Sequence, residues 1–312
     1  MECGKGGYKM NILKRERSIN LGSKVADIII YIIAAISALI TLYPIYYVLI
    51  LSLSSPEHAI TMQVFWLPKG FYLEGYKRLL SDRQLWVSYS NTIFYAVCET
   101  ILMLVVSTMA AYTLSSKHLK GRKVLNYFLL IPMYFSGGII PLFLLVLQLG
   151  IYNTPWALIL PGAVSIWYII LIKSYFGTIP ESLREAAELD GANSYQVLWN
   201  VFLPTSKPIL AVVALYKIVG VWNGWFRASI FIIDSKWQPL QIYLRRVLVE
   251  QDIDLSQELL TAEELMADQV NRLSNNQFKY TIIIVSSLPM LIAYPYFQKF
   301  FVKGVMLGSL KE

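Results

Sequence analysis

The sequence predicts an all-α, polytopic membrane protein with six transmembrane helices. Hydrophobic residues make up 56% of the 312 residues and charged residues only 15%, and the mean hydropathy is +0.52. These values lie outside the range of soluble globular domains. The apolar residues are gathered in long runs, and the basic residues are concentrated in some of the segments between them. Lipid is therefore the expected solvent for most of the chain.

Six apolar runs each come close to the length that crosses a membrane. A helix needs about 20 apolar residues to span about 30 Å of hydrocarbon. The runs cover residues 25–53, 86–114, 124–149, 156–172, 208–233 and 280–301. The first run is far longer than the apolar part of a signal peptide, and no small-residue cleavage site follows it. We therefore expect it to remain in the protein as a span.

The distribution of Lys and Arg predicts that both termini are cytoplasmic, because basic segments are retained on that side. Basic residues cluster before the first run, after the second and at the C-terminal end: Lys5, Lys9, Lys14, Arg15, Arg17, Lys24, Lys117, Lys120, Arg122, Lys123, Lys299, Lys303 and Lys311. Segments 54–85, 150–155 and 234–279 then face outward. The chain is divided into a basic tail (1–24), a transmembrane domain (25–301) and a cytoplasmic C-terminal tail (302–312).

Several functional classes lack the residues that they need. The two cysteines and two histidines have no metal-binding or redox spacing, so we expect no metal site and no catalytic residue. No G-x-x-x-x-G-K-[ST] phosphate loop is present, so this chain does not carry its own ATPase. The net charge of +7 is explained by the cytoplasmic segments, which argues against nucleic acid as a partner.

The inward-facing segment 173–207 departs from this charge pattern, because it contains three basic and four acidic residues. Thr178 and Glu181 have the spacing of a capping box around Pro180, which predicts the start of a short helix. Gly191 predicts the left-handed end of that helix. The acidic residues then lie on a short, exposed helix between the fourth and fifth runs.

A second short helix is predicted from Asn193, with Gln196 at the capping-box position. Its apolar residues recur with helical spacing, and two prolines are expected to end it: Tyr195, Leu198, Trp199 and Phe202, followed by Pro204 and Pro208. Two helices joined at a glycine also occur in DNA-binding proteins and as amphipathic loops on lipid. The tether between two spans disfavours DNA, and the acidic first helix disfavours anionic lipid. A protein partner is the better interpretation.

This segment resembles the EAA loop of the inner-membrane permeases of ABC importers. The residues that carry the resemblance are Glu185-Ala186-Ala187, Asp190-Gly191-Ala192 and Leu203-Pro204. In that family the loop contains a coupling helix that docks on the ATPase subunit. The resemblance implies that Glu185, Ala186, Ala187, Asp190, Gly191, Leu203 and Pro204 are the ATPase-coupling residues, with Glu185 accepting charge-assisted hydrogen bonds and Gly191 allowing the sharp turn.

Most of the chain is similar to the maltose-type carbohydrate permeases. The similar positions are Asn91-Thr92, Ala110-Ala111-Tyr112, Trp222-Asn223, Tyr294-Pro295 and Phe301-Val302-Lys303-Gly304. The segment 132–138 and the long segment before the sixth run resemble the branch for oligosaccharides from complex, often uronate-bearing polysaccharides. The resemblance implies a bacterial cytoplasmic membrane protein that moves a sugar by alternating access.

The resemblance also implies a set of partners. They are a second, homologous permease, two copies of a cytoplasmic ABC ATPase that bind ATP and Mg, and an extracellular solute-binding lipoprotein. The acidic outward segment 234–279 is either part of the surface that receives the binding protein or a solvated cap over the spans. No cofactor is expected in this chain itself.

Charged residues inside the runs are costly in lipid and are candidates for function. Glu99 lies near the middle of the second run, and Lys217 and Arg227 lie in the fifth. Lys217 either pairs with Glu99 or extends its amine toward the cytoplasm. Arg227 either meets an anionic sugar or anchors its helix at the membrane interface.

Aromatic rings and amides are the groups that bind sugars, since rings stack on pyranose faces and amides bind hydroxyls. The candidate substrate path comprises Tyr134, Trp167, Trp222, Asn223, Trp225, Arg227 and Glu99. Aromatic belts at the membrane interfaces explain such residues equally well. In the maltose-type relatives the partner permease can hold most of the substrate contacts. In the third run, Pro132, Gly137, Gly138 and Pro141 predict helix deformation or close packing, with a hinge as the second interpretation.

Two other classes remain as alternatives. An ion-coupled secondary transporter would be favoured if Glu99 were a proton or sodium site, although such a protein has no use for an EAA loop. A membrane-embedded enzyme comes third, because no nucleophile, base and metal set is visible. The sequence does not identify the sugar, its length or its charge.

Overall fold

The structure is a computed structural model that describes residues 21–61, 63–250, 277–293 and 295. Every described element is a helix, so the predicted all-α class is confirmed over this part of the chain. The helices are α1 Leu21–Ser52, α2 Pro56–Ile60, α3 Glu74–Ser81, α4 Arg83–Ser115, α5 Arg122–Tyr134, α6 Ile139–Gln148, α7 Trp156–Gly162, α8 Ile166–Phe176, α9 Glu181–Leu189, α10 Ser194–Val197, α11 Leu203–Thr205, α12 Lys207–Trp222, α13 Phe226–Phe231 and α14 Leu240–Arg245. Two π-helical turns, Leu198–Phe202 and Arg246–Glu250, and the 3-10 turn Ser235–Trp237 complete the series, and a last helix covers Gln277–Ala293.

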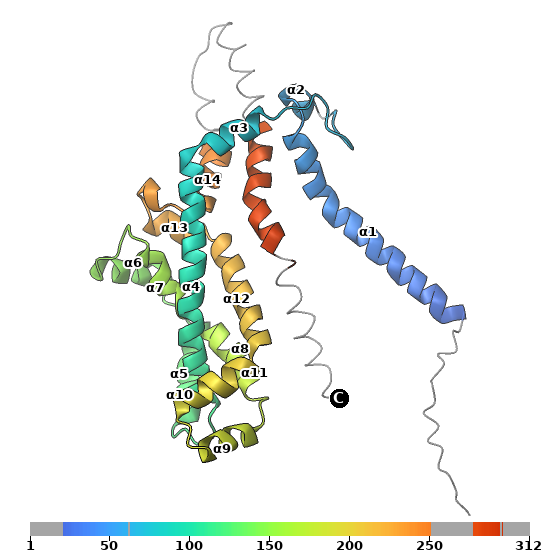
Figure 1. The fold of residues 1–312 in the computed structure, drawn as a ribbon. Coiled ribbons are helices and arrows are strands. Elements are labelled where there is room, and N and C mark those ends of the chain that lie inside the picture. Colours follow the sequence, from blue (N-terminus) through green and yellow to red (C-terminus); the bar gives the residue numbers. More distant parts are fainter. Residues whose placement is uncertain (1–20, 62, 251–276, 294, 296–312) are drawn as a thin grey trace, which may run out of the picture.

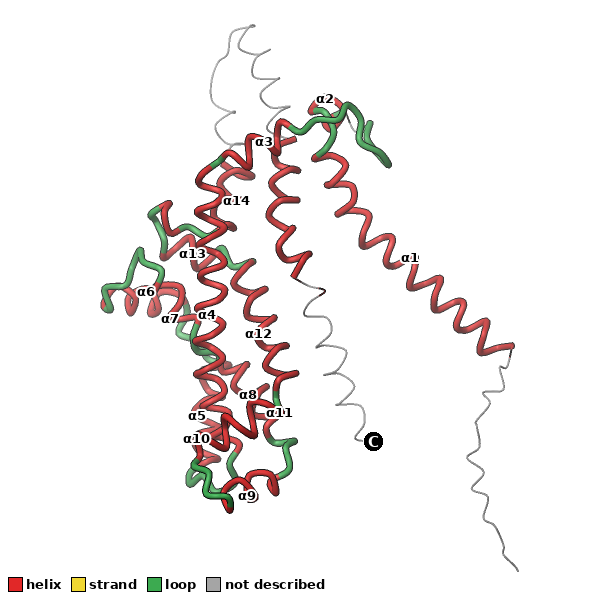
Figure 2. Tube along the Cα trace, in the orientation of Figure 1, coloured by secondary structure: helices red, strands yellow, loops and turns green. Residues whose placement is uncertain are grey.

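Helix α4 is the axis of the molecule, and α8 and α12 pack along it (Figures 1 and 2). It begins at Asp82, whose carboxylate accepts a hydrogen bond from the backbone nitrogen of Gln84 at 2.8 Å. Large and small side chains alternate on its buried face, including Tyr95, Met103 and Ala111. This alternation lets neighbouring helices approach α4 closely.

Three described helices are long and apolar enough to cross a membrane: Ala26–Ser52, Arg83–Ser115 and Trp156–Phe176. Two further pairs meet the same criteria only if each bent pair is one span, namely Arg122–Tyr134 with Ile139–Gln148 and Ser194–Thr205 with Lys207–Trp222. The shorter apolar helix Gln277–Ala293 covers part of the sixth run. The remainder of that run, the segment 251–276 and both tails, including Phe301-Val302-Lys303-Gly304, lie outside the described residues.

Three of the predicted runs are interrupted. The third bends by 107° between α5 and α6, where Gly138 adopts a φ of +82°, so the predicted deformation is confirmed. The fourth breaks between α7 and α8. The prediction of one continuous helix over 208–233 is wrong, because α12 ends at Trp222 and α13 starts at Phe226. Gly224 packs closely there, since a β-carbon would lie 3.1 Å from the carbonyl oxygen of Gly220.

The described loops lie at two ends of the helix bundle. This arrangement is expected if successive spans cross the membrane in opposite directions. At one end, Gln84 donates to the carbonyl of Ser235 at 2.7 Å, and Asn153 accepts from the backbone nitrogen of Asp234 at 2.9 Å. At the other end, Lys117 lies 3.8 Å from Glu181. The three segments predicted to face outward are thus joined to one another, and two predicted inward loops meet at the opposite end.

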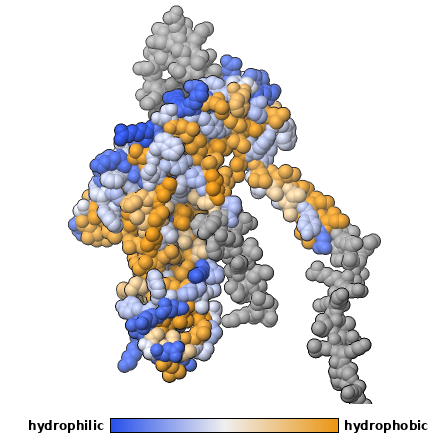
Figure 3. All heavy atoms as spheres, in the orientation of Figure 1, coloured by the Kyte–Doolittle hydropathy of each residue, from blue (hydrophilic) through white to orange (hydrophobic). Residues whose placement is uncertain are grey.

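The polar surface of the molecule lies at the same two ends as these loops (Figure 3). Hydrophilic atoms gather around α9 and α10 at one end and near α3 at the other, and hydrophobic surface dominates between them (Figure 3). Helix α1 leans away from the rest of the described chain (Figure 1), and none of its most apolar window is buried. Its exposed isoleucines and leucines therefore require lipid or another protein as their environment.

Candidate functional site

The hairpin of α9 and α10 lies at the polar end of the molecule opposite α3 (Figure 1). Helix α9 ends in a Schellman motif. The backbone nitrogen of Ala192 donates to the carbonyl of Ala187 at 3.0 Å, and that of Gly191 donates to Glu188 at 3.0 Å. Gly191 has a φ of +80°, so the predicted left-handed end is confirmed. A residue with a β-carbon is disfavoured at this position.

The start of α10 is also as predicted, whereas the start of α9 is not. Asn193 and Gln196 form a reciprocal capping box, with bonds of 3.0 and 2.8 Å. The predicted capping box of Thr178 and Glu181 is wrong. The Thr178 hydroxyl donates instead to the carbonyl of Tyr175 at 2.7 Å, and α9 begins at Pro180 without a side-chain cap.

The second helix of the hairpin continues further than expected. It passes through the π-helical turn Leu198–Phe202 and includes Leu203 and Pro204 as the first residues of α11. Pro204 is tolerated because it lies in the first turn of that segment. The chain bends by 80° at Ser206, between the hairpin helix and α12.

Most of the motif residues on the hairpin are exposed. Glu185, Ala186, Asp190 and Gly191 are exposed, and Glu185 makes no ion pair with a described side chain. Leu189 is 89% exposed at the tip of the hairpin. The apolar stripe predicted for the second helix is only partly buried. Leu198 and Phe202 are buried, whereas Tyr195 and Trp199 face outward over a groove beside α4.

Arg184 attaches α9 to the transmembrane helices, and the sequence patterns did not identify it. Its guanidinium carbon lies 5.0 Å from the ring centroid of Tyr112 on α4 and 5.1 Å from that of Phe202. Glu181 lies 3.7 Å away. The residue is buried, so these cation–π contacts act with little competition from water. The i, i+3 spacing of Glu181 and Arg184 was the available signal.

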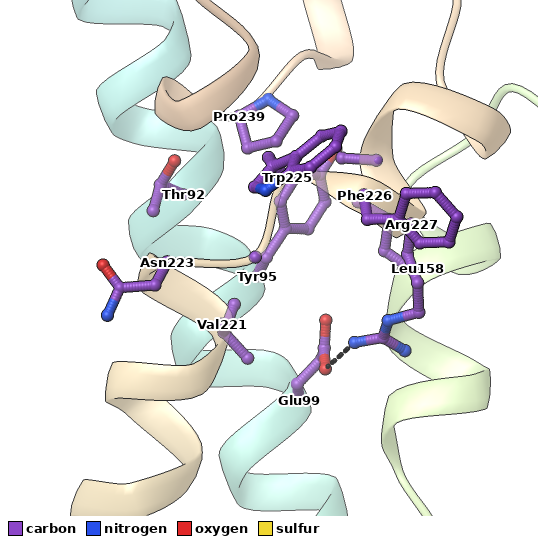
Figure 4. Close-up of a pocket in the computed structure, with 12 residues that line it drawn as sticks. Thr92, Tyr95, Glu99, Leu158, Val221, Asn223, Trp225, Phe226, Arg227 and Pro239 are labelled. Carbon is purple, nitrogen blue, oxygen red and sulfur yellow. Dashed lines mark ion pairs between the residues drawn. The ribbon is translucent and has the colours of Figure 1, made fainter. Parts of the chain in front are cut away.

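A second candidate region is a cavity of about 230 Å³ between α4, α12 and α13. Glu99, Trp225 and Arg227 line it, together with Thr92, Tyr95, Leu158, Val221, Asn223, Gly224, Phe226, Ala228 and Pro239. Figure 4 shows Arg227 pointing toward Glu99, with the rings of Tyr95 and Trp225 above this pair in the view. The amide of Asn223 points away from this pair. Among the described lining residues, Glu99 is the only acid and Arg227 the only base.

Glu99 is shared by two basic groups. Lys217 donates to Oε2 of Glu99 at 2.6 Å and to the carbonyl oxygen of Gly162 at 2.8 Å. Arg227 Nη2 lies 3.5 Å from the same Oε2. The Glu99 side chain is 2% exposed and that of Arg227 is 39% exposed. Of the two alternatives for Lys217, the structure therefore selects the pair with Glu99.

Gly162 makes room for this pair, and no sequence pattern pointed to it. A β-carbon at Gly162 would overlap the carboxylate of Glu99 and lie 3.0 Å from Nζ of Lys217. The end of α7 thus approaches α4 and α12 only because residue 162 has no side chain. The cost of burying Glu99 is offset by its two cationic neighbours and by the Lys217 bond to the Gly162 carbonyl.

Four of the seven residues of the predicted path line the cavity, namely Glu99, Asn223, Trp225 and Arg227, whereas Trp222, Tyr134 and Trp167 do not. Trp222 is 6% exposed and packs edge-on against Tyr89 in an apolar core, so it contributes to packing and not to the cavity wall. Tyr134 and Trp167 are exposed at other places on the surface and are not among the lining residues. Trp225 lines the cavity, with Arg245 stacked 4.2 Å from its ring centroid.

Two motif residues, Asn91 and Thr92, bind the backbone of a loop that is predicted to face outward. Asn91 donates to the carbonyls of Lys236 and Gln238, and Thr92 accepts from the backbone nitrogen of Leu240 at 2.8 Å. Nearby, the Tyr243 hydroxyl donates to Asp82 at 2.6 Å. Burial and this hydrogen bond raise the pKa of Tyr243, so its phenol remains a donor. Among the described residues, no group of three or more His, Cys, Asp and Glu side chains could hold a metal ion.

Comparison with known proteins gives consistent results. Residues 103–307 match the family model described as "Binding-protein-dependent transport system inner membrane component". The chain is 37% identical to protein LplC of Bacillus subtilis, over 87% of this chain and 90% of the relative. It is 32% identical to the polygalacturonan/rhamnogalacturonan transport system permease protein YtcP of the same organism, over 93% and 99%.

A solved structure has the same fold. It is a chain of a bacterial ABC transporter involved in the import of the acidic polysaccharide alginate, 35% identical to this chain, with a TM-score of 0.80. The similarity covers 90% of this chain and 98% of that one. The family model matches well over half of the residues, and two relatives above 30% identity span nearly the whole sequence. The chain belongs to the family of inner-membrane components of binding-protein-dependent transport systems, the permeases of ABC importers.

Proposed function

We propose that this chain is one permease subunit of an ATP-driven importer that moves an oligosaccharide, delivered by an extracellular binding protein, across the bacterial cytoplasmic membrane. Several relatives are named as carbohydrate permeases, among them those of a polygalacturonan/rhamnogalacturonan transport system, an arabinooligosaccharides transport system and a melibiose/raffinose/stachyose importer. The chain would form six spans, with both termini, the loop 173–207 and the C-terminal tail on the cytoplasmic side. A second, homologous permease would cover the exposed apolar helices, α1 among them.

The observation that carries this proposal is the exposed hairpin of α9 and α10. Leu189 is almost fully exposed at the polar end of the molecule, where lipid tails cannot cover it, and Glu185 has no ion-pair partner in the described chain. An apolar tip beside unpaired acids fits the groove of a protein with basic residues around an apolar floor. We assign this role to a cytoplasmic ATPase, of which two copies would serve the permease pair and bind ATP and Mg.

The coupling residues of the hairpin have separate roles in this proposal. Glu185 binds a basic group of the ATPase, and Ala186 keeps the docking face small. Ala187 packs against the transmembrane core, Asp190 and Gly191 form the turn, and Leu203 and Pro204 lie in the corner that leads to α12. Movement of the ATPase dimer would tilt α12 through this corner and α4 through Arg184.

The experiment is ATP-driven uptake into proteoliposomes that contain this chain, its partner permease and the ATPase, with the binding protein supplied outside. Glu185→Ala removes a charge-assisted hydrogen bond and should reduce uptake on the order of tenfold. Glu57→Ala is the matched control, since Glu57 is an exposed acid on α2 at the opposite end. Normal ATP-driven uptake by Glu185→Ala, or uptake driven by an ion gradient without ATP, would refute the proposal.

An ion-coupled mechanism is not favoured by the geometry around Glu99. A proton or sodium site needs a carboxylate that becomes free during the cycle, whereas Glu99 is held by Lys217 at 2.6 Å and has Arg227 at 3.5 Å. The permease family in which the chain lies also gives an ion-coupled mechanism no support.

A further inference from the structure

Among the described residues, the charged groups in and around the cavity carry more positive than negative charge. Lys217 is close enough to neutralise Glu99 by itself, with a hydrogen bond of 2.6 Å. Arg227 lies at 3.5 Å, which is longer than a normal N–H···O hydrogen bond. One carboxylate therefore faces two cations, and the charge in excess is the guanidinium of Arg227. Arg245 adds a third positive charge nearby, over the ring of Trp225.

This excess charge lies where a ligand could reach it. Arg227 is 39% exposed and lines the cavity, whereas Lys217 is buried behind Glu99. A cation in partly apolar surroundings is stabilised when an anion enters, because the field of the cation is weakly screened there. Release of Arg227 from Glu99 would leave no stranded charge, since Lys217 continues to neutralise the carboxylate.

The neighbouring groups indicate which anion would enter. A guanidinium binds a planar carboxylate through two parallel hydrogen bonds. Trp225 lines the same cavity and is 41% exposed, and an aromatic ring of this kind stacks on the apolar face of a pyranose. The volume of about 230 Å³ has room for one sugar unit and not for a long chain.

We propose that this cavity is a subsite for one uronate unit of an acidic oligosaccharide, with Arg227 binding the carboxylate that distinguishes acidic from neutral substrates. Glu99 is the internal anion that holds Arg227 when the subsite is empty. Lys217 is a positioning residue that holds the Glu99 carboxylate in place. This inference rests on the proposed function, because it assigns a substrate class to the same import path.

The test uses the complete importer in proteoliposomes and two probes of equal length. One is trigalacturonate, and the other is the same trisaccharide with its carboxyl groups reduced to neutral alcohols. The variants are Arg227→Gln, which removes the charge, and Arg227→Lys, which retains it without the bidentate geometry. Lys77→Gln is the control, because Lys77 is an exposed cation that pairs with Glu74 on α3 outside the cavity.

The expected result is a loss of selectivity. Arg227→Gln should lower uptake of trigalacturonate on the order of tenfold and change uptake of the reduced probe less than twofold, because one charge-assisted carboxylate contact is removed. Arg227→Lys should fall between Arg227→Gln and the native protein. Lys77→Gln should behave as the native protein with both probes. Equal thermal unfolding midpoints of the variants would show that folding is not the cause.

Direct binding to the purified complex, without the binding protein, provides a second measurement. Calorimetric titration with galacturonate and with galactose should show binding of galacturonate only, and Arg227→Gln should abolish it. If inorganic phosphate or sulfate competes as well as galacturonate, the cavity is a general anion site and the uronate assignment is wrong.

The two proposals fail in different ways. If neither trisaccharide nor any other oligosaccharide is taken up with ATP, the proposed import function is wrong. If oligosaccharides are taken up with ATP but the native protein transports only the reduced probe, or Arg227→Gln affects both probes equally or neither, the uronate subsite is wrong and the import function stands.

Discussion

The guanidinium carbon of Arg184 lies 5.0 Å from the centroid of the Tyr112 ring, and this contact joins the exposed hairpin to the end of α4. Tyr112 is itself packed edge-on against Phe202, with ring centroids 5.0 Å apart. Arg184 therefore contacts two rings, one on α4 and one on the second hairpin helix. A force applied to α9 would reach α4 and the second hairpin helix through the same side chain.

Replacement of Arg184 by Ala should uncouple ATP hydrolysis from uptake. The change removes two cation–π contacts, each worth about 1 to 2 kcal/mol at a desolvated site, and leaves Glu181 without its nearest partner. The hairpin would still dock on the ATPase, so ATPase activity should persist while uptake per ATP falls several-fold. Parallel measurement of phosphate release and of uptake in proteoliposomes tests this expectation.

Two control variants separate the ring contact from other effects. Tyr112→Phe keeps the aromatic face and should retain normal coupling, whereas Tyr112→Ala should resemble Arg184→Ala. Lys117→Ala removes only the exposed partner of Glu181, 3.8 Å away, and should have little effect because exposed ion pairs contribute little. Normal coupling in Arg184→Ala together with uncoupling in Lys117→Ala would contradict the proposed connection.

Gly162→Ala should destabilise the protein by disrupting the buried pair beside it. The added methyl group would overlap the carboxylate of Glu99, so either that side chain or α7 must shift. Gly220→Ala is the matched control, because Gly220 lies in a helix and a β-carbon there meets nothing within 4 Å. The control should be neutral or stabilising by up to about 1 kcal/mol. Thermal unfolding of the purified chain should show a lower midpoint for Gly162→Ala only.

Removal of the charge on Glu99 should cost more stability than removal of the charge on Lys217. Glu99→Gln leaves Lys217 buried without an anion, which costs about 3 to 5 kcal/mol. Lys217→Gln leaves Glu99 with Arg227 as its remaining partner. The double variant should be more stable than the sum of the single changes predicts, by about 1 to 3 kcal/mol. Additive shifts of the thermal midpoint would show that the two side chains do not act as a pair.

The local features of the hairpin could be predicted because they depend on neighbouring residues. Gly191 and the pair Asn193 and Gln196 act over three or four positions, and each has the predicted conformation. The prediction that Thr178 caps α9 was wrong for an equally local reason. Its hydroxyl bonds back to the carbonyl of Tyr175 in the last turn of α8, so it was not available to cap α9.

The cavity could not be predicted, because it depends on which helices are adjacent. Glu99 and Lys217 are 118 positions apart, and periodicity identifies the buried face of a helix but not its neighbour. The sequence gives no indication of the role of Gly162, because the space left by its missing side chain is occupied by Glu99 and Lys217 from other helices. The place of Trp222 in an apolar core could not be predicted for a similar reason. Sequence alone does not distinguish an aromatic residue that packs in a core from one that lines a path.

Substitution of Gly191 should impair coupling in proportion to the cost of its left-handed conformation. A β-carbon at this position would meet nothing within 4 Å, so the cost comes from the backbone alone, about 1 to 2 kcal/mol for an L-residue. Asn tolerates this conformation better than β-branched residues do. Gly191→Asn should therefore retain more ATP-driven uptake than Gly191→Val, with ATPase activity measured in parallel.

Gly121 provides the matched control for this prediction, because it has a φ of +77° and equally open surroundings. It precedes α5 at the same end of the bundle but is not part of the hairpin. Gly121→Val should lower the thermal midpoint about as much as Gly191→Val, since both impose the same backbone strain. Only Gly191→Val should lower uptake per ATP, because only that strain reorients the surface that docks on the ATPase. Equal losses of coupling in both variants would mean that general destabilisation, and not the geometry of the hairpin, limits transport.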